Sequence, residues 1–177
     1  MANNCWNWIS FNGEVGELIE KFEKFNDISN TIEAYQSLFP EGYDVPSGET
    51  LLFENPKWFD THIIDYTEEK DNLTVSGDSA WSPPCRLVQL LCKAYGITAR
   101  IEFEECVCDF GGYEEVNEEG EVVESLETTY KEWRYINEGV EGMASELEYY
   151  EEEDREAFLE EVKAFMSEED YNELINN

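Results

Sequence analysis

Apolar and polar residues alternate in several short stretches of the chain, which is the pattern of strands with one buried face. The first stretch is rich in Trp, Ile and Phe and ends at the turn signal Asn12-Gly13. Four polar residues at 68–71 separate two later stretches, so these two are expected to form a hairpin. The six predicted strands are residues 5–11, 58–66, 72–76, 97–103, 106–113 and 121–126.

Two stretches carry apolar residues at helical spacing, which predicts amphipathic helices that cover the strands. The first spans residues 14–25. The second is expected to begin at Ser82-Pro83-Pro84, because serine can cap a helix and proline is tolerated in its first turn, and to end at Gly96. Their predicted buried faces comprise Val15, Leu18, Ile19, Phe22 and Phe25 in the first helix, and Leu87, Leu90, Leu91 and Ala94 in the second.

Residues 26–56 are less regular and are interpreted as an insertion over the surface of the domain. A short helix is expected at 32–39, which Pro40 would end. Gly42, Pro46 and Gly48 then indicate a loop.

The order strand, helix, strand, strand, helix, strand predicts a ferredoxin-like α+β fold, in which two helices cover one face of an antiparallel sheet. Extra strands extend the sheet, so the domain is placed at residues 1–126. Residues 127–177 are predicted to be an acidic helical C-terminal extension, because their apolar residues have helical spacing. Ser167 is expected to cap its last helix with Asp170 at the capping-box position, and Leu174 and Ile175 to anchor that helix.

Several motifs resemble the YubB-type ferredoxin-like domain family of phage and plasmid proteins, over roughly residues 3–126. They are Asn4-Cys5-Trp6-Asn7, Trp58, the string Asp78-Ser79-Ala80-Trp81-Ser82-Pro83-Pro84, Ile101-Glu102-Phe103-Glu104-Glu105, Gly111-Gly112 and Gly120-Glu121-Val122-Val123. The resemblance implies a ferredoxin-like fold and an origin in a phage or another mobile element. It implies no established activity, so no catalytic residue follows from it.

Charge narrows the classes of partner. The chain has 43 acids and 11 bases, a net charge of -32, and residues 101–177 account for -23 of it. Phosphates and anionic membranes would be repelled, so direct binding of nucleic acid or of a membrane is not expected. A basic protein surface is the natural partner, and the alternative is that the charge serves solubility alone.

The sequence predicts neither catalysis nor a bound cofactor or metal. It lacks the common catalytic and phosphate-binding motifs, and His62 is its single histidine. The five cysteines are expected to be reduced and buried, although Cys106 and Cys108 would share one face of a strand and could geometrically hold a metal. No apolar run is long enough to span a membrane and the start lacks a signal-peptide pattern, so a cytoplasmic location is expected.

Two functions are compatible with these features. The favoured one is an acidic inhibitor that binds the basic nucleic-acid-binding surface of a host defence protein, such as a nuclease, by mimicry or steric block. The alternative is an interaction module that binds through the insertion or through the sheet face bearing Trp6 and Trp8, a face that a homodimer or the C-terminal helices would otherwise cover. The acids predicted to contact the basic surface are Glu114, Glu115, Glu118, Glu119, Glu151, Glu152, Glu153, Asp154, Glu160 and Glu161.

Overall fold

The computed structural model describes residues 4–176, the side chain of Glu153 excepted. The chain divides into two compact units, described separately below. Unit 1 comprises residues up to 108 together with 112–126, and unit 2 comprises residues 109–111 together with those from 127 onward.

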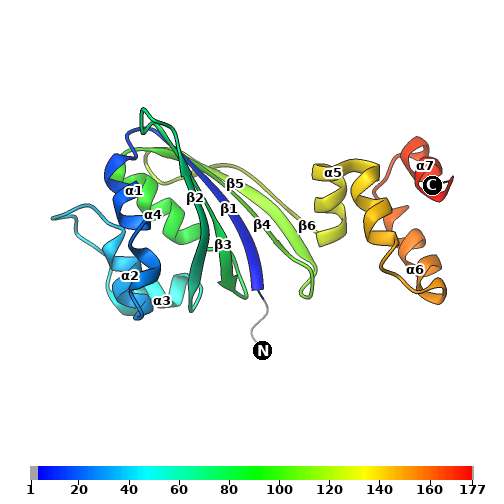
Figure 1. The fold of residues 1–177 in the computed structure, drawn as a ribbon, viewed down its shortest axis with the longest axis horizontal. Helices are drawn as coiled ribbons and strands as arrows, with labels where there is room; N and C mark the ends of the chain where they lie inside the picture. Colours follow the sequence, from blue (N-terminus) through cyan, green and yellow to red (C-terminus); the bar gives the residue numbers. More distant parts are fainter. Residues whose placement is uncertain (1–3, 177) are drawn as a thin grey trace. The chain divides into compact units, whose positions relative to one another are not determined.

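A six-stranded antiparallel sheet, of which all but the first residues of its fifth strand and the last of its sixth belong to unit 1, forms the centre of that unit (Figure 1). Its strands are β1 (Asn4–Asn12), β2 (Phe59–Tyr66), β3 (Asn72–Ala80), β4 (Thr98–Glu105), β5 (Phe110–Val116) and β6 (Val122–Thr128). The spatial order is β2-β3-β1-β4-β5-β6, so β1 lies between β3 and β4 and is antiparallel to both. The first four strands have the ferredoxin-like arrangement and β5 and β6 extend it, which confirms the predicted fold class.

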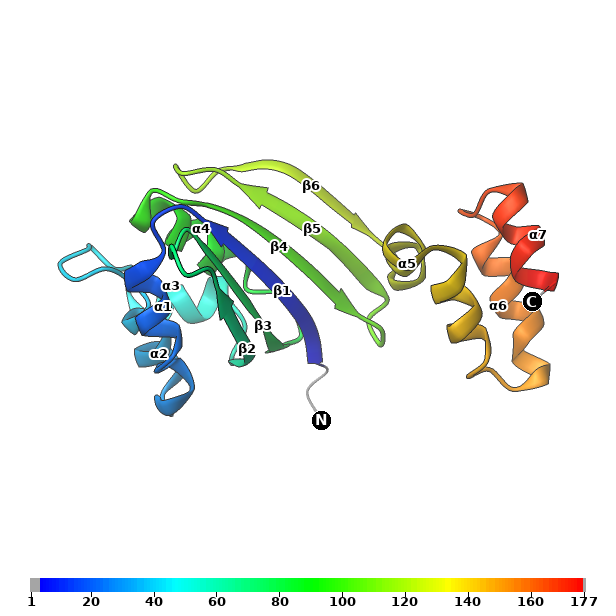
Figure 2. The ribbon, with the colours of Figure 1, turned by 45° about the horizontal axis from the view of Figure 1, so that its top comes forward.

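The helices of unit 1 lie on one face of this sheet (Figures 1 and 2). They are α1 (Gly16–Phe22), the 3-10 helix η1 (Phe25–Asp27), α2 (Thr31–Ser37), α3 (Gly48–Glu54) and α4 (Cys85–Tyr95). Strand alternation explains the core between the two layers: Cys5, Asn7, Ile9 and Phe11 of β1 are buried, whereas the residues between them are exposed or half-buried. We call the face that carries those intervening residues the open face.

Residues 26–56 contribute to the core as well as to the surface. Tyr35 of α2 is fully buried, and its hydroxyl donates a hydrogen bond to the carbonyl oxygen of Pro56 at 2.8 Å. Helix α3 was not predicted. The helix is short and its sequence carries few signals: a serine at the N-cap position, Ser47, which accepts a hydrogen bond from the Thr50 amide, and one buried apolar residue, Leu51.

Asn55 joins this segment to helix α4. Its buried side chain donates to the carbonyl of Leu51 at 3.0 Å and accepts from the amide of Leu87, in the first turn of α4, at 2.6 Å. The expectation that Ser82 caps α4 is therefore wrong, because an asparagine about 30 residues earlier supplies the acceptor that the first turn needs. The predicted end at Gly96 is confirmed, and that glycine has the left-handed conformation.

Unit 2 is a small helical body with its own hydrophobic core. It contains α5 (Tyr130–Leu147), which is kinked at Gly139, α6 (Glu152–Val162) and α7 (Glu168–Asn176). Ser167 and Asp170 form the predicted cap of α7, but Ile175 is exposed, and the helix is anchored by buried Leu174 together with partly buried Tyr171. The buried residues of this core are Met143, Phe158, Val162, Met166 and Leu174.

The described helices include none that is both long enough and apolar enough to cross a bilayer.

Gly77 gives a test of the close approach between β2 and β3. A Cβ atom there would lie 2.0 Å from the carbonyl oxygen of Asp60, so Gly77→Ala must push two backbones apart. We expect a loss of about 2–3 kcal/mol of unfolding free energy, measured by urea denaturation. Gly16→Ala is the matched control: its Cβ would meet only Lys70 at an ordinary 3.5 Å, and it should gain about 0.4–1 kcal/mol. Equal stability of the two variants would contradict this packing.

Candidate functional site

Two tryptophans of β1, Trp6 and Trp8, are separated by one residue, so both lie on the open face of the sheet. Trp6 is 38% exposed and Trp8 is 42% exposed. Strand register places Trp6 between Asp78 of β3 and Glu104 of β4, and Trp8 between Ser76 and Glu102. Because directly paired residues of antiparallel strands point to the same side, each indole is flanked on this face by acidic or polar side chains.

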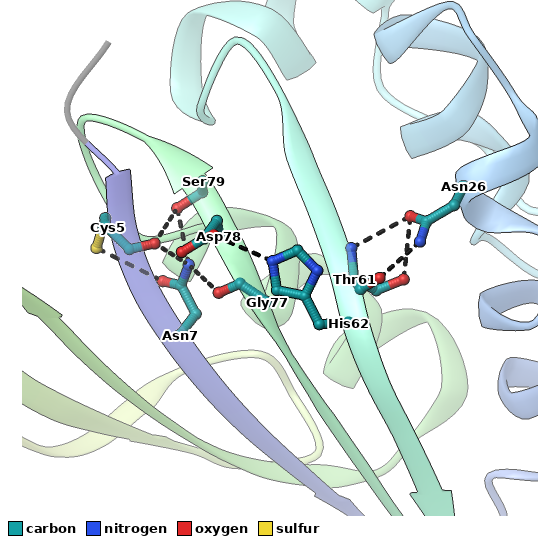
Figure 3. Close-up of polar contacts among 8 residues, drawn as sticks. All are labelled: Cys5, Asn7, Asn26, Thr61, His62, Gly77, Asp78 and Ser79. Carbon is teal, nitrogen blue, oxygen red and sulfur yellow. Dashed lines mark hydrogen bonds and ion pairs between the residues drawn. The ribbon is translucent and has the colours of Figure 1, made fainter. Parts of the chain in front are cut away.

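Acidic residues also meet at the neighbouring strand. Asp60 of β2 pairs directly with Asp78 of β3, and directly opposed like charges destabilise a sheet. His62 lies at the irregularity in β2 and partly offsets this, because its Nε2 atom is 3.0 Å from Oδ2 of Asp78 (Figure 3). The imidazole ring also stacks on Trp6, with ring centroids 5.9 Å apart. The single histidine thus links an acid and an aromatic ring at the surface.

The guanidinium group of Arg100, a residue of β4, also lies on the open face. Arg100 lies 3.9 Å from the ring centroid of Tyr113 and makes ion pairs with Glu102 at 2.7 Å and with Glu115 at 2.8 Å. Partial burial would lower the pKa of Arg100, but the hydrogen bonds and charges of these two glutamates outweigh it and raise that pKa. The group is therefore bound between an aromatic ring and two carboxylates.

A buried polar network lies behind the tryptophans, on the core side of β1 and β3 (Figure 3). The side-chain amide of Asn7 donates to the carbonyl oxygen of Cys5 and to Oγ of Ser79, both at 2.8 Å, and Ser79 donates to the carbonyl of Ser82 at 2.7 Å. Burial raises the pKa of the Cys5 thiol to about 12, so it stays protonated and is no nucleophile. The network joins the two strands and has no visible chemistry of its own.

Ser76 differs from these satisfied groups. It is fully buried, it lies on the open-face side of β3, and it is paired with Trp8 of β1 and Ile63 of β2. Its hydroxyl makes no hydrogen bond within the part of the chain that the structure describes. An unpaired buried hydroxyl costs free energy, so its position beside Trp8 calls for an explanation.

The acids predicted to contact a basic surface do not form one site. Glu114, Glu115, Glu118 and Glu119 belong to unit 1, and the other six belong to unit 2. Glu114 and Glu115 are already occupied, since Glu114 accepts from Gln89 at 3.1 Å and Glu115 binds Arg100. Glu118 and Glu119 are exposed in the turn between β5 and β6, as predicted.

The predicted acids of unit 2 are arranged along α6. Glu151 occupies the N-cap position but makes no side-chain capping bond, and Glu152, Asp154, Glu160 and Glu161 are exposed on the helix. The described residues exclude the side chain of Glu153. Phe158 and Val162 of the same helix are buried in the core of unit 2, so one face of α6 is apolar and the other acidic. Glu161 is paired with Lys131 at 2.6 Å.

The cysteine prediction is partly wrong. Cys5 and Cys92 are buried and Cys85 is half-buried, but Cys106 and Cys108 are exposed and lie in the turn between β4 and β5. The buried carboxylate of Glu105 holds this turn by accepting hydrogen bonds from the amides of Val107 and Cys108. Among the residues that the structure describes, no group of three or more His, Cys, Asp or Glu could hold a metal ion.

Sequence reasoning missed the acids of β2 and β3 and the role of Ser76. Asp60, Asp78 and Ser76 are ordinary residues in an acidic chain, and only the strand register brings them beside the tryptophans. The available signal was the alternation in β1, which already placed Trp6 and Trp8 on one face.

Comparison with known proteins identifies the family. The model of the ferredoxin-like domain in Api92-like proteins matches residues 61–160, more than half of the chain, and the chain belongs to this family. The matched range starts within β2 and runs through α5 into α6, so it differs from the 3–126 range of the resemblance seen in the sequence. Neither the curated proteins nor the solved structures give a match.

Two serines on opposite sides of β3 give a matched test of the buried polar groups. Ser79→Ala removes the acceptor of Asn7 and the donor to Ser82, and should cost about 1–3 kcal/mol of unfolding free energy. Ser76→Ala removes a hydroxyl with no partner in the described chain, and should be neutral or stabilising by up to about 1 kcal/mol. Urea denaturation compares them, and a Ser76→Ala loss as large as that of Ser79→Ala would be inconsistent with an unpaired hydroxyl.

Thiol reactivity tests the placement of the cysteines. At pH 8, iodoacetamide should modify Cys106 and Cys108 first, because they are exposed. Cys5 and Cys92 should remain unmodified until the protein unfolds, because they are buried and burial raises the pKa of each to about 12. Mass spectrometry of proteolytic fragments locates the label, and rapid modification of Cys5 in the native protein would disprove its burial.

Proposed function

We propose that this protein is an acidic inhibitor that binds the basic nucleic-acid-binding surface of another protein. The observation that carries the proposal is the acidic face of α6. Glu152, Glu156 and Glu160 are exposed and spaced four residues apart, so they form one line along the helix. Within the described part of the chain, no base lies at ion-pair distance from these three carboxylates.

The charge density of α6 suits a site that normally holds nucleic acid. Its 11 residues include six acids and one arginine, a net charge of -5. At about 1.5 Å per residue the helix is roughly 16 Å long. One nucleic-acid strand carries about one phosphate per 3.4 Å, or about five over that length. The helix therefore approximates the charge of a single strand of a duplex.

The hydrophobic core of unit 2 gives this line of charge a rigid base. Phe158 and Val162 are almost completely buried, and the Phe158 ring packs on Tyr150 with centroids 4.9 Å apart. A helix anchored in this way loses little conformational entropy when it binds, which favours affinity. The high net charge would also accelerate encounter with a basic partner at low salt.

The resemblance to phage and plasmid proteins supplies the proposed setting. A mobile element benefits from blocking host nucleases, and a nuclease must present a basic groove to its substrate. We therefore place the partner among host defence proteins that bind nucleic acid. The kinship to the YubB-type family, the mobile-element origin and a cytoplasmic site of action are parts of the same proposal.

Charge reversal on α6 tests the proposal. The immobilised full-length protein is incubated with nuclease-treated lysate of a bacterium that carries defence systems, and each retained protein is assayed for DNA binding with and without the soluble protein. We expect a retained protein that loses its DNA, and at least tenfold weaker retention by Glu156→Lys/Glu160→Lys. Raising NaCl from 50 to 300 mM should release it, because exposed charges are screened.

The control variant is Glu68→Lys/Glu69→Lys in the turn between β2 and β3. These glutamates are exposed, and the double change alters the net charge as much as the α6 variant does. It should retain the partner within about twofold of the natural chain. Equal losses in the two variants would show a response to net charge alone, and retained proteins that keep their DNA would refute inhibition.

A further inference from the structure

We propose that the open face of the sheet in unit 1 is a second binding site, which takes arginine or lysine side chains of a basic protein segment. The site comprises Trp6 and Trp8 of β1 with the polar residues that the register places beside them, above all Asp78 and Ser76. It is distinct from the acidic face of α6 and does not depend on the function proposed for that helix.

The residue types define the ligand. The face of an indole attracts cations, and tryptophan does so more strongly than other aromatic side chains. Here each indole has a carboxylate in its own cross-strand row: Asp78 and Glu104 beside Trp6, and Glu102 beside Trp8. Asp78 already bonds to His62 and Glu102 to Arg100, so an external cation would share these carboxylates with groups of the chain. A cation held there would meet both a ring face and a negative charge. A phosphate or a carboxylate ligand would be repelled by the same acids.

The other half of the open face already shows this mode of binding with a group of the chain itself. The Arg100 guanidinium lies over the Tyr113 ring and bonds to Glu102 and Glu115. The half around Trp6 and Trp8 repeats the combination of ring and carboxylate. The register places no basic residue in the Trp6 and Trp8 rows, and the one base beside them is His62, which stacks on Trp6 and bonds to Asp78 from the irregularity in β2. The surface thus offers an external cation what Tyr113 and its glutamates offer Arg100.

Two features here oppose folding and are consistent with binding. Asp60 and Asp78 oppose each other directly, which raises the free energy of the sheet; His62 offsets part of this repulsion, and a bound cation would relieve more of it. The Ser76 hydroxyl is fully buried beside Trp8 and unpaired in the described chain. An ammonium or guanidinium group would donate a hydrogen bond to it only where the Trp8 ring moves aside to admit that group. The packing of the sheet leaves the Ser76 hydroxyl unsatisfied within the described residues.

Charge also selects among possible occupants of this face. A second copy would bring Asp60, Asp78, Glu102 and Glu104 against the same four acids, and Arg100 is already paired. Self-association across this face would therefore be opposed by like charges. A basic segment neutralises the acids and covers both indoles.

A short peptide probes the site without saturating the whole acidic surface. The blocked peptide Gly-Arg-Gly-Arg-Gly is titrated into the full-length protein by calorimetry at 100 mM NaCl, with its citrulline analogue, equal in shape but neutral, as the ligand control. We expect binding of the arginine peptide alone. Trp6→Ala and Trp8→Ala should each weaken it by about 3- to 30-fold, which corresponds to a cation–π contact of about 0.7–2 kcal/mol.

Matched variants separate this site from general electrostatics. Phe53→Ala removes an aromatic ring that is 91% exposed on α3, and Glu156→Lys/Glu160→Lys changes the charge of α6; both should bind the peptide within about twofold of the natural chain. Asp78→Asn, which keeps the side-chain volume, should weaken binding at least threefold. Circular dichroism establishes that each variant is folded, and the indole N–H signals of Trp6 and Trp8 should shift on binding in NMR spectra.

Three results would overturn the proposal. The first is equal binding of the arginine and citrulline peptides, or none of either. The second is binding that survives in Trp6→Ala/Trp8→Ala but is lost in Glu156→Lys/Glu160→Lys, which would assign the cation to α6. The third is a natural chain that sediments as a dimer and becomes monomeric in Trp8→Ala, which would make a second copy the occupant.

Discussion

The pairing of β1 with both β3 and β4 is the constraint on which the rest of unit 1 depends. A strand places successive residues on opposite faces, and a shift of one residue would exchange the faces. Cys5, Asn7, Ile9 and Phe11 are committed to the core. The two tryptophans are therefore committed to the open face, and the register with β3 and β4 decides which acids they meet.

The side chain of Asn7 stabilises that register from the core side of the sheet. It bonds within β1 to the Cys5 carbonyl and across to Ser79 and Gly77 of β3. A buried amide is costly unless it is satisfied, so a slipped pairing would lose these bonds and bury the amide unpaired. Polar groups on the core side thus specify one alignment of the strands, and the same alignment fixes which residues are neighbours on the open face.

Electrostatics set a second constraint, because few bases are available to balance the acids. Residues 1–126 hold 26 acids and 7 bases, and residues 127–177 hold 17 acids and 4 bases, so the net charges are -19 and -13. The ferredoxin-like domain at residues 1–126 is therefore strongly acidic itself, although dividing the chain after residue 100 assigns most of the negative charge to the C-terminal part. Several bases are used inside their own unit, as in Arg86 with Glu54 and Lys131 with Glu161. Such exposed pairs stabilise little, and they leave most of the acids for other roles.

The sequence was most informative where local rules and tertiary structure agree. The strands, α1, α4 with its glycine end and the Ser167 cap follow from alternation, helical spacing and capping chemistry, and the order of elements then predicts the fold. Prediction failed where a partner is distant in sequence. Ser82 looked like a cap, yet Asn55 performs that role, and Cys106 and Cys108 looked like strand residues, yet the Glu105 carboxylate makes their segment a turn. The candidate site had the same limit, since Asp60, Asp78 and Trp6 come together only through pairing over long sequence distances.

The double role of Asn55 also makes two regions of the chain into one cooperative folding unit. With one amide it ends α3 and begins α4, so opening either helix in the native state leaves a buried polar group of the other unsatisfied. Segment 26–56 and α4 should thus open and exchange amide hydrogens together. Segment 26–56 thus supplies a buried hydrogen bond on which the first turn of α4 depends, although Asn55 lies about 30 residues before that turn in the sequence.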